Sequence, residues 1–504
     1  RGTHLLIENG YLSMITMQSW MSLSDYELLR TRLLESTCIT SMLHVGTRGF
    51  DAIGGEVVST TAFILILSRQ DLKGEYIDLT DGKTEQEKSD KAKYVILAKS
   101  YYVVHKKAFD SIPGKSIAYW ITKPIEDVFS ISFSLSNIAE ARQGIIPGNA
   151  DLFIRNWPEV SYPNISRITN SYEAMKSSQC KWFPYMKGGD YRKWYGNMNN
   201  VINMYNDAHD IKYSGKNNNY RLRDPKYYFI EGLTWTDITS SDISVRYTPK
   251  GYLFDAAGPM VFFNNQSDVL LYQGLLNSNS AAKIFSVLSP GMHYSVEHIA
   301  KFPIIKILDN NRIDIVKKVR SLISISKRDW DVFETSWDFS IHPLLDKNII
   351  EPEGFAFEDD YELQEYLGNN QHNRIFYSGI YGSRTAWSPI EFAYLRYKDW
   401  ANKAFYHMKK NEEDLNRIFI DIYGLQDELQ PEEDDSMVSV HKVFDDKSEI
   451  PESMKGTNSY ALTKADVVKS LISYAVGCMF GRYSLDVGGL VYAGGEWDES
   501  KYVT

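Results

Sequence analysis

The order of secondary structure expected near the start of the chain constrains its fold more than any other feature. An apolar, β-branched run at 10–17 predicts a buried strand, and leucines at helical spacing predict a helix over 25–36. Two further β-rich runs follow at 39–45 and 57–67. The order strand, helix, strand, strand is typical of the end of a doubly wound α/β sheet whose last strands form an antiparallel pair. We therefore expect the chain to begin inside such a domain, with the ligand-binding opening half upstream.

Length and composition predict a multidomain globular protein. At 504 residues the chain exceeds what one hydrophobic core organises, so about three domains are expected. No run approaches the roughly 18 apolar residues of a transmembrane helix. The three cysteines form no CxxC pair, and the 10 histidines show no metal-ligand spacing. We therefore expect a cytoplasmic protein with reduced thiols, no metal site and no membrane partner.

Residue patterns divide the chain into three expected regions. Residues 1–130 continue the α/β domain. Residues 131–310 are expected to form a mixed α/β domain. Its central part, from Gly144 to about Phe263, is rich in Gly, Asn, Tyr and Trp, which predicts short strands and long loops. Residues 311–504 are expected to be mainly helical, with an acidic loop. Helical spacing predicts helices over 270–287 and 311–333.

Charge is distributed unevenly along the chain, although the formal net charge is −10. Residues 401–504 hold 11 Lys/Arg and 19 Asp/Glu, whereas residues 181–226 hold 9 Lys/Arg and 4 Asp. A phosphate backbone responds to charges within about 10 Å, so the local balance matters more than the total. The overall acidity therefore does not exclude a nucleic-acid partner for the central stretch.

The segment 181–197, KWFPYMKGGDYRKWYGN, interleaves basic and aromatic residues around a Gly-Gly turn. Cations suit phosphates or base edges, aromatic rings suit stacking, and an asparagine carboxamide suits adenine. These candidates are Lys187, Arg192, Lys193, Trp194, Tyr195 and Asn197. The competing interpretation places the aromatic residues in the core, with the charges as a solvated rim. The sequence leaves both interpretations open.

A second basic stretch lies at 221–228, RLRDPKYY, where Arg221, Arg223 and Lys226 are candidates for the same role. The sequence contains no phosphate-binding loop, no GxSxG and no other catalytic constellation. No catalytic residue is therefore assigned.

Several stretches resemble a known group of enzymes. NGYLSMITMQSWMSLSDYELLR at 9–30 resembles the stretch after the catalytic motif in adenine-N6 DNA methyltransferases, and EVVSTTAFIL at 56–65 resembles their closing strand. Later stretches resemble the target-recognition and C-terminal helical regions of the phage-resistance methyltransferases of BREX systems (PglX-like). These stretches are 181–197, 223–262, 275–285 and 472–486.

The resemblance implies S-adenosylmethionine-dependent methylation of adenine N6 in duplex DNA, with the target base flipped out of the helix. It makes residues 1–130 the C-terminal remnant of a Rossmann-like catalytic domain, 131–310 a target-recognition domain and 311–504 a helical C-terminal domain. The family's cofactor loop and NPPY motif belong upstream of residue 9, so the fragment is expected to be inactive and to bind no cofactor alone. Arg246 joins the residues above as an expected contact to the DNA backbone or guanine.

A second hypothesis makes the chain a protein-interaction module. Its acidic last 100 residues would dock onto other defence proteins, and a phage DNA-mimic protein would compete for the basic face. A third hypothesis is a DNA-binding subunit without a catalytic partner in the same chain. The expected strand at 10–17, which lacks an upstream partner, argues against that third hypothesis.

Overall fold

The computed structural model describes residues 2–50, 58–214, 219–291, 293–350, 389–456 and 460–503. The chain forms two compact units. Unit 1 comprises Arg1–Ile138, Ala281–Lys306 and Ile422–Asp427, and unit 2 comprises Ala139–Ser280, Ile307–Asp421 and Glu428–Thr504. This division differs from the three expected regions, because the segments after 307 pack mostly with residues 139–280. No helix among the described residues is long and apolar enough to cross a membrane.

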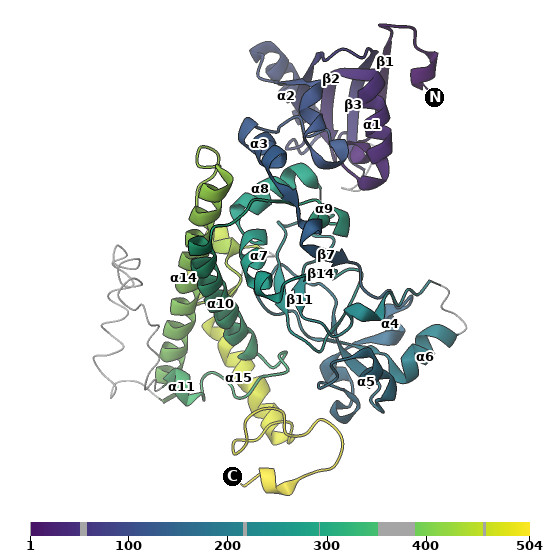
Figure 1. Cartoon of the computed structure of the whole chain (residues 1–504). Coiled ribbons are helices and arrows are strands. Elements are labelled where there is room, and N and C mark those ends of the chain that lie inside the picture. The colour runs from purple at the N-terminus through teal and green to yellow at the C-terminus, as the bar shows by residue number, and fades with distance from the viewer. Residues whose placement is uncertain are drawn as a thin grey trace. The chain divides into compact units, whose positions relative to one another are not determined.

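A five-stranded sheet organises unit 1, in the strand order β1-β3-β2-β4-β5 (Figure 1). Strand β3 lies antiparallel between β1 and β2, which confirms the expected antiparallel pair. β2 and β4 are parallel, whereas β4 and β5 are antiparallel. The strands are β1 (Tyr11–Met17), β2 (Thr37–Gly46), β3 (Thr60–Leu67), β4 (Lys73–Asp78) and β5 (Tyr102–His105).

Strand β1 is more exposed than expected. It is the outer strand of the sheet and pairs only with β3 among the described residues, and most of its side chains are exposed. The expectation of a buried strand at 10–17 is therefore wrong. The expected strand at 57–67 begins at Thr60, and residue 57 lies outside the described residues.

Helices and one short pair of strands complete unit 1. The expected helix over 25–36 is confirmed, beginning as a 3₁₀ turn and continuing as α1 (Glu27–Ser36). Strand β6 (Phe133–Ser134) pairs with β15 (Pro303–Ile304), so residues far apart in sequence meet in this unit. The other helices are α2 (Glu85–Ala98), α3 (Lys123–Ile131) and α9 (Val296–Ala300), and α8 (Asn279–Leu288) begins at the boundary.

Two four-stranded sheets form the first half of unit 2, as the mixed α/β pattern predicts. One has the order β13-β9-β10-β8 and the other the order β12-β11-β14-β7. The first contains β13 (Leu253–Phe254), β9 (Trp182–Met186), β10 (Asn200–Asn203) and β8 (Ile154–Asn156). The second contains β12 (Arg246–Thr248), β11 (Gly232–Thr234), β14 (Met260–Phe263) and β7 (Ala139–Arg142). Small helices α4 (Ala150–Phe153), α5 (Tyr172–Ser177) and α6 (Tyr205–Tyr213) accompany these sheets.

The helix expected over 270–287 is interrupted. The structure has α7 (Val269–Leu276) and then α8, with Asn277 and Ser278 between them. The Asn277 carboxamide accepts from the Val245 N–H and donates to the Val245 carbonyl, both at 2.8 Å. Because this side chain pairs with a neighbouring backbone segment, the helix ends where the local pattern predicts that it continues.

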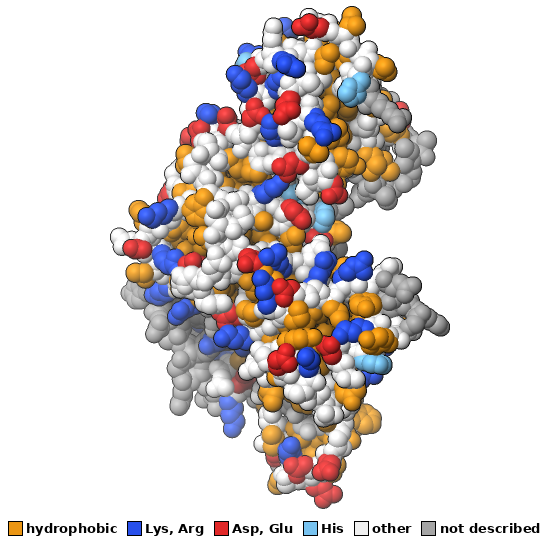
Figure 2. Space-filling model, turned by 45° about the vertical axis from the view of Figure 1, so that its right-hand side comes forward, with side chains coloured by type: hydrophobic (Ala, Val, Ile, Leu, Met, Phe, Trp, Pro, Cys, Tyr) orange, Lys and Arg blue, Asp and Glu red, His pale blue; other side chains and the backbone are white. Residues whose placement is uncertain are grey.

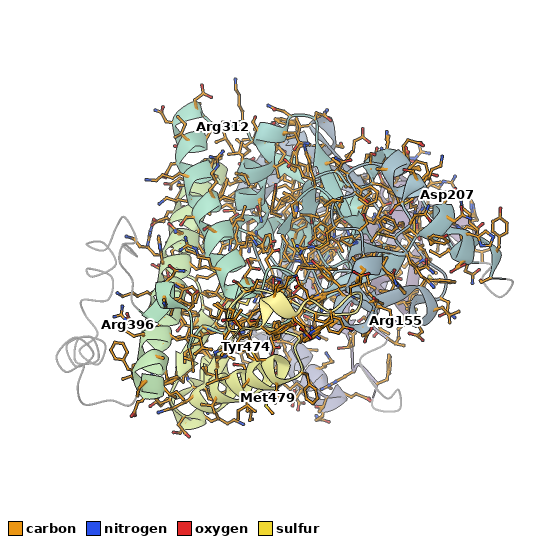
Figure 3. The ribbon with its side chains drawn as sticks, turned by 90° about the horizontal axis from the view of Figure 1, so that it is seen from below. Arg155, Asp207, Arg312, Arg396, Tyr474 and Met479 are labelled. Atoms are coloured by element: carbon orange, nitrogen blue, oxygen red, sulfur yellow. The ribbon has the colours of Figure 1, made fainter. Side chains whose placement is uncertain are left out.

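Long helices form the second half of unit 2. α10 (Asp309–Asp331) confirms the helix expected over 311–333. It runs beside α14 (Pro389–Tyr423), with Lys318 Nζ 2.8 Å from Asp414 Oδ2 (Figure 1). α15 (Lys464–Met479) buries Tyr474 and exposes Met479 (Figure 3). The remaining elements are α11 (Lys347–Ile350) and the parallel strands β16 (Lys442–Phe444) and β17 (Ala461–Thr463).

Candidate nucleic-acid interface

The basic-aromatic segment 191–196 lies in the core of unit 2. The Trp194 N–H donates to the Val245 carbonyl, and the Tyr247 N–H donates to the Trp194 carbonyl. Arg192 is 2% exposed, Lys193 4% and Arg246 0%. Trp194 and Tyr195 are also buried. The segment therefore packs as an internal strand-like connection.

Arg192 is neutralised inside the protein. Its Nη2 lies 3.0 Å from Asp329 Oδ2 on α10, and its guanidinium lies over the rings of Trp330 and Tyr460 at 5.1 and 4.8 Å. His441 Nδ1 lies 2.8 Å from the other oxygen of Asp329. Burial would raise the pKa of Asp329, but His441 and Arg192 hold that pKa below its ordinary value.

Lys193 is neutralised by two carboxylates from the C-terminal part of the chain. Its Nζ lies 2.8 Å from Glu433 Oε1 and 3.5 Å from Glu412 Oε2. The Trp194 indole N–H donates to Glu412 Oε1. Two carboxyl groups face one ammonium in this buried cluster, and burial raises the pKa of Glu412 to about 7, with Glu433 adding to the effect.

Arg246 is buried with hydrogen-bond partners but no recorded ion pair in the described part of the chain. Its Nη1 donates to the Arg192 carbonyl at 3.2 Å, and its Nη2 donates to Thr236 Oγ1 at 3.4 Å. Burial lowers the pKa of this guanidinium to about 10.

DNA contact is therefore the wrong expectation for five of the predicted residues. A phosphate cannot reach buried side chains. Arg192 and Lys193 are in addition held by the protein's own carboxylates. The aromatic residues lie in the core, as the competing interpretation predicts. The three cations are buried as well, although that interpretation placed them on a solvated rim. The five residues are Arg192, Lys193, Trp194, Tyr195 and Arg246.

The remaining cations of the prediction are exposed. Lys187 follows the end of β9 and precedes the Gly188–Gly189 turn, where both φ angles are positive, as expected. Arg223 is held in place, because its Nε donates to the Gly144 carbonyl at 3.2 Å and its Nη2 to Gln143 Oε1 at 2.7 Å. Lys226 lies over the Tyr227 ring at 4.7 Å.

The last two predicted residues are Arg221 and Asn197. Arg221 is exposed and donates to the Tyr220 carbonyl at 2.8 Å. Asn197 is half-buried, and its carboxamide donates to the Asp190 carbonyl at 2.9 Å. That bond occupies one donor of the carboxamide that was expected to contact adenine.

One end of the first sheet of unit 2 brings several polar and basic residues into a row. In β8 and β10, Asn156 pairs with Asn200, and Asn200 pairs with Tyr185 of β9. β13 runs parallel to β9. Beyond β13, Asp255 pairs with Ile145, and the next residue, Ile146, pairs with Arg221. Strands lie about 4.8 Å apart, so these five steps span about 24 Å. From one side to the other the row contains Asn156, Asn200, Lys187, Asp255, Ile145–Ile146 and Arg221.

Sequence reasoning missed Asn156 and Asn200 in this row, and Arg155 next to Asn156. These residues lie at strand ends that meet only through the pairing of β8 with β10. Figure 3 shows Arg155 at the margin of the molecule. The one usable signal is weak, namely polar residues at the boundaries of short apolar runs.

On the side that Figure 2 presents, the described side chains do not form one basic face. Figure 2 shows Lys/Arg and Asp/Glu side chains intermixed on the side that it presents. The expected acidic surface is also smaller than predicted: Glu433 faces Lys193, and Asp435 lies 2.6 Å from Lys409 Nζ and 3.1 Å from Lys442 Nζ. Glu432 and Asp434 remain exposed.

Comparison with curated proteins finds two methyltransferases. The chain is 38% identical over 510 residues to the adenine-specific methyltransferase PglX of Lacticaseibacillus casei (strain Zhang), covering 99% of the chain and 38% of that protein. It is 33% identical over 495 residues to the adenine-specific methyltransferase BrxX of Escherichia coli O9:H4 (strain HS), covering 97% of the chain and 36% of that protein. The chain is a homologue of part of these methyltransferases. It spans less than two fifths of their length. No protein-family profile matches the chain.

Solved structures give weaker likenesses. The type IIL restriction-modification enzyme MmeI in complex with DNA is 13% identical, with a TM-score of 0.41, over 64% of this chain and 42% of that one. The DrdV–DNA complex is 9% identical, with a TM-score of 0.38, over 64% and 38%. The type ISP enzyme LlaBIII bound to DNA is 12% identical, with a TM-score of 0.36, over 64% and 26%. At these scores the likeness carries no conclusion about fold or function.

Methyltransferase homologues imply S-adenosylmethionine as the methyl donor. A hollow of about 370 Å³ on the sheet of unit 1 is lined by apolar and hydroxyl residues, with no charged side chain among them. The cofactor carries a sulfonium, an ammonium and a carboxylate, so this hollow does not fit it. Among the described residues no group of three His, Cys, Asp or Glu side chains is arranged to hold a metal ion.

Proposed function

We propose that the chain supplies DNA recognition to a site-specific adenine-N6 DNA methyltransferase of a BREX-type phage-defence system in the cytoplasm. The observation that carries the proposal is the 38% identity to an adenine-specific methyltransferase over 99% of the chain. In this proposal the whole enzyme uses S-adenosylmethionine, and the present chain alone is inactive.

Each unit has its own part in this proposal. Unit 1 is the closing part of a Rossmann-like catalytic domain, and its support is the antiparallel β3 between β1 and β2. Unit 2 combines target recognition with the helical C-terminal region. Its contact surface is formed by the side chains of the row that reach the surface, with the neighbouring Arg223 and Lys226, since Asp255 and Ile145 of the row are buried. A row of about 24 Å would follow roughly seven base pairs at 3.4 Å each.

Salt dependence of duplex binding tests the proposal. Fluorescence anisotropy of a labelled duplex with the 504-residue chain should give a log–log slope of affinity against salt of about −3 or steeper, because several phosphates are contacted. Arg221→Ala and Arg223→Ala should each reduce the slope by about one unit. Affinity that is unchanged between 50 and 300 mM salt would contradict phosphate contact.

The alternative is docking to other defence proteins or to a phage DNA-mimic protein. In the acidic loop, 431–435, protein docking is supported only by the exposed Glu432 and Asp434. Glu433 and Asp435 of this loop face lysines of the same chain. A DNA mimic would instead use the exposed cations of the sheet end. Its competition with duplex DNA should disappear in the Arg221→Ala, Arg223→Ala double variant.

A further inference from the structure

A polar hollow of about 390 Å³ lies at the sheet end, where β8, β10 and the residue after β9 meet. Four of its side chains are charged and two are carboxamides. Its lining consists of Ala150, Asp151, Ile154, Arg155, Asn156, Glu159, Lys187 and Asn200.

The charges in this hollow balance. Arg155 and Lys187 contribute two positive charges, and Asp151 and Glu159 contribute two negative charges. A site built for phosphate concentrates donors and cations, and carboxylates within it would repel the anion. The edge of a base is neutral and presents donors and acceptors side by side, so the mixed lining suits a base edge better than the backbone.

Hydrogen bonds fix the lining before any ligand arrives. Glu159 accepts from the Asn156 N–H at 2.9 Å and from the Asn156 carboxamide at 3.3 Å. Arg155 Nη1 donates to the carbonyls of Asp151 and Ile154 at 2.5 and 2.6 Å. A lining that is already ordered loses little entropy when it binds.

Asn200 has bonding capacity left in its carboxamide. Its Nδ2 donates to Asn156 Oδ1 at 3.3 Å, which uses one of its two hydrogens. Among the described residues, no protein donor is recorded for its Oδ1. An asparagine that offers one acceptor and one donor together matches the N6–H and N7 positions of adenine in the major groove.

We propose that this hollow receives the edge of one A·T pair in the major groove, with Asn200 contacting the adenine and Lys187 at its rim. The inference rests on the proposed function, because it assumes that unit 2 is placed against duplex DNA. It names a reading position that is separate from Arg221 and Arg223, whose charge would serve the backbone.

Selection from a randomised duplex library tests the assignment. The 504-residue chain and its Asn200→Ala variant are incubated with the library, and the bound DNA is sequenced. The variant should lose preference at one A·T position by about tenfold or more, which corresponds to one lost bidentate contact. Affinity for duplexes that carry another base pair at that position should stay within about twofold, because no charge is removed.

Three further variants keep the result interpretable. Lys187→Ala replaces an exposed side chain, so the variant should remain folded. It should weaken the base preference at the same or the adjacent position. Asn164→Ala, an exposed asparagine outside the hollow, should leave the motif unchanged. Arg221→Ala should lower affinity equally for all sequences.

The outcomes separate the two proposals. A parent chain that does not bind duplex DNA overturns the proposed function and this inference with it. A parent that binds without base preference, or an Asn200→Ala motif identical to the parent's, overturns the inference alone. Loss of a G·C position in place of an A·T position also overturns the assignment to Asn200.

Discussion

The buried ammonium of Lys193 pairs with two carboxylates that are distant in sequence. Lys193→Ala leaves Glu412 and Glu433 facing each other without a cation, and should cost about 3–5 kcal/mol of unfolding free energy. Urea unfolding measures this loss. The matched exposed variant Lys187→Ala should change stability by less than about 0.5 kcal/mol. If Lys193→Ala weakened DNA binding without loss of stability, the side chain would be a DNA contact after all.

Glu412 should make the stability of unit 2 depend on pH. Its folded-state pKa is raised to about 7, so the folded chain binds this proton more tightly than the unfolded chain does. The stabilisation is complete below the unfolded pKa of about 4.3 and is lost as pH rises through about 7, on the order of 3–4 kcal/mol.

Glu412→Gln isolates this contribution. The amide keeps an oxygen for the Trp194 N–H but does not titrate. The unfolding free energy, measured from pH 4.5 to 8, should therefore fall less steeply with pH for the variant than for the parent. Parallel curves for the two proteins would show that Glu412 is ionised throughout.

The contact between α7 and α10 requires a small residue. A Cβ on Gly274 would lie 3.0 Å from Val319 Cγ2 and 3.2 Å from Ile315 Cγ2. Gly274→Leu should therefore overpack this contact and cost about 1–3 kcal/mol, measured as a lower urea midpoint. Gly456→Leu is the control, because nothing lies within 4 Å of its Cβ position. An equal midpoint shift in both variants would remove the helix contact as the cause.

Elements were predictable where their signal is local. α1, β3 and α10 follow from spacing and composition within their own residues. The break after α7 was not predictable, because it depends on Asn277 pairing with Val245, 32 residues away. The row at the sheet end was missed for the same reason, since the order of its strands is set by long-range pairing.

The buried cations show why the charge pattern misled. The sequence displays a basic stretch at 181–226 and an acidic one at 401–504 as if they were separate surfaces. In the fold they partly neutralise each other, through Lys193 with Glu412 and Glu433. Partners that are 219 and 240 residues apart cannot be assigned from composition.

Removal of residues 401–504 should unfold unit 2 as a whole. The deletion takes away the second half of α14, both carboxylates around Lys193, and His441 beside Asp329. The urea transition and the near-UV circular dichroism signal of unit 2 should be lost from the truncated chain, whereas those of unit 1 remain. A truncated chain that retains both would show that residues 139–280 fold independently.

The ion pairs between residue 193 and the C-terminal helices also bear on how the specificity of such enzymes can be exchanged. A chimera joined at residue 310 would place Arg192 and Lys193 of one parent opposite α10, α14 and the 428–441 segment of the other. The ion pairs then form only if carboxylates stand at the matching positions. If residues 139–280 carry target recognition as proposed, transfer of specificity between homologues requires that α10, α14 and the 428–441 segment travel with them. The alternative is to graft only the outward-facing residues of the sheet end.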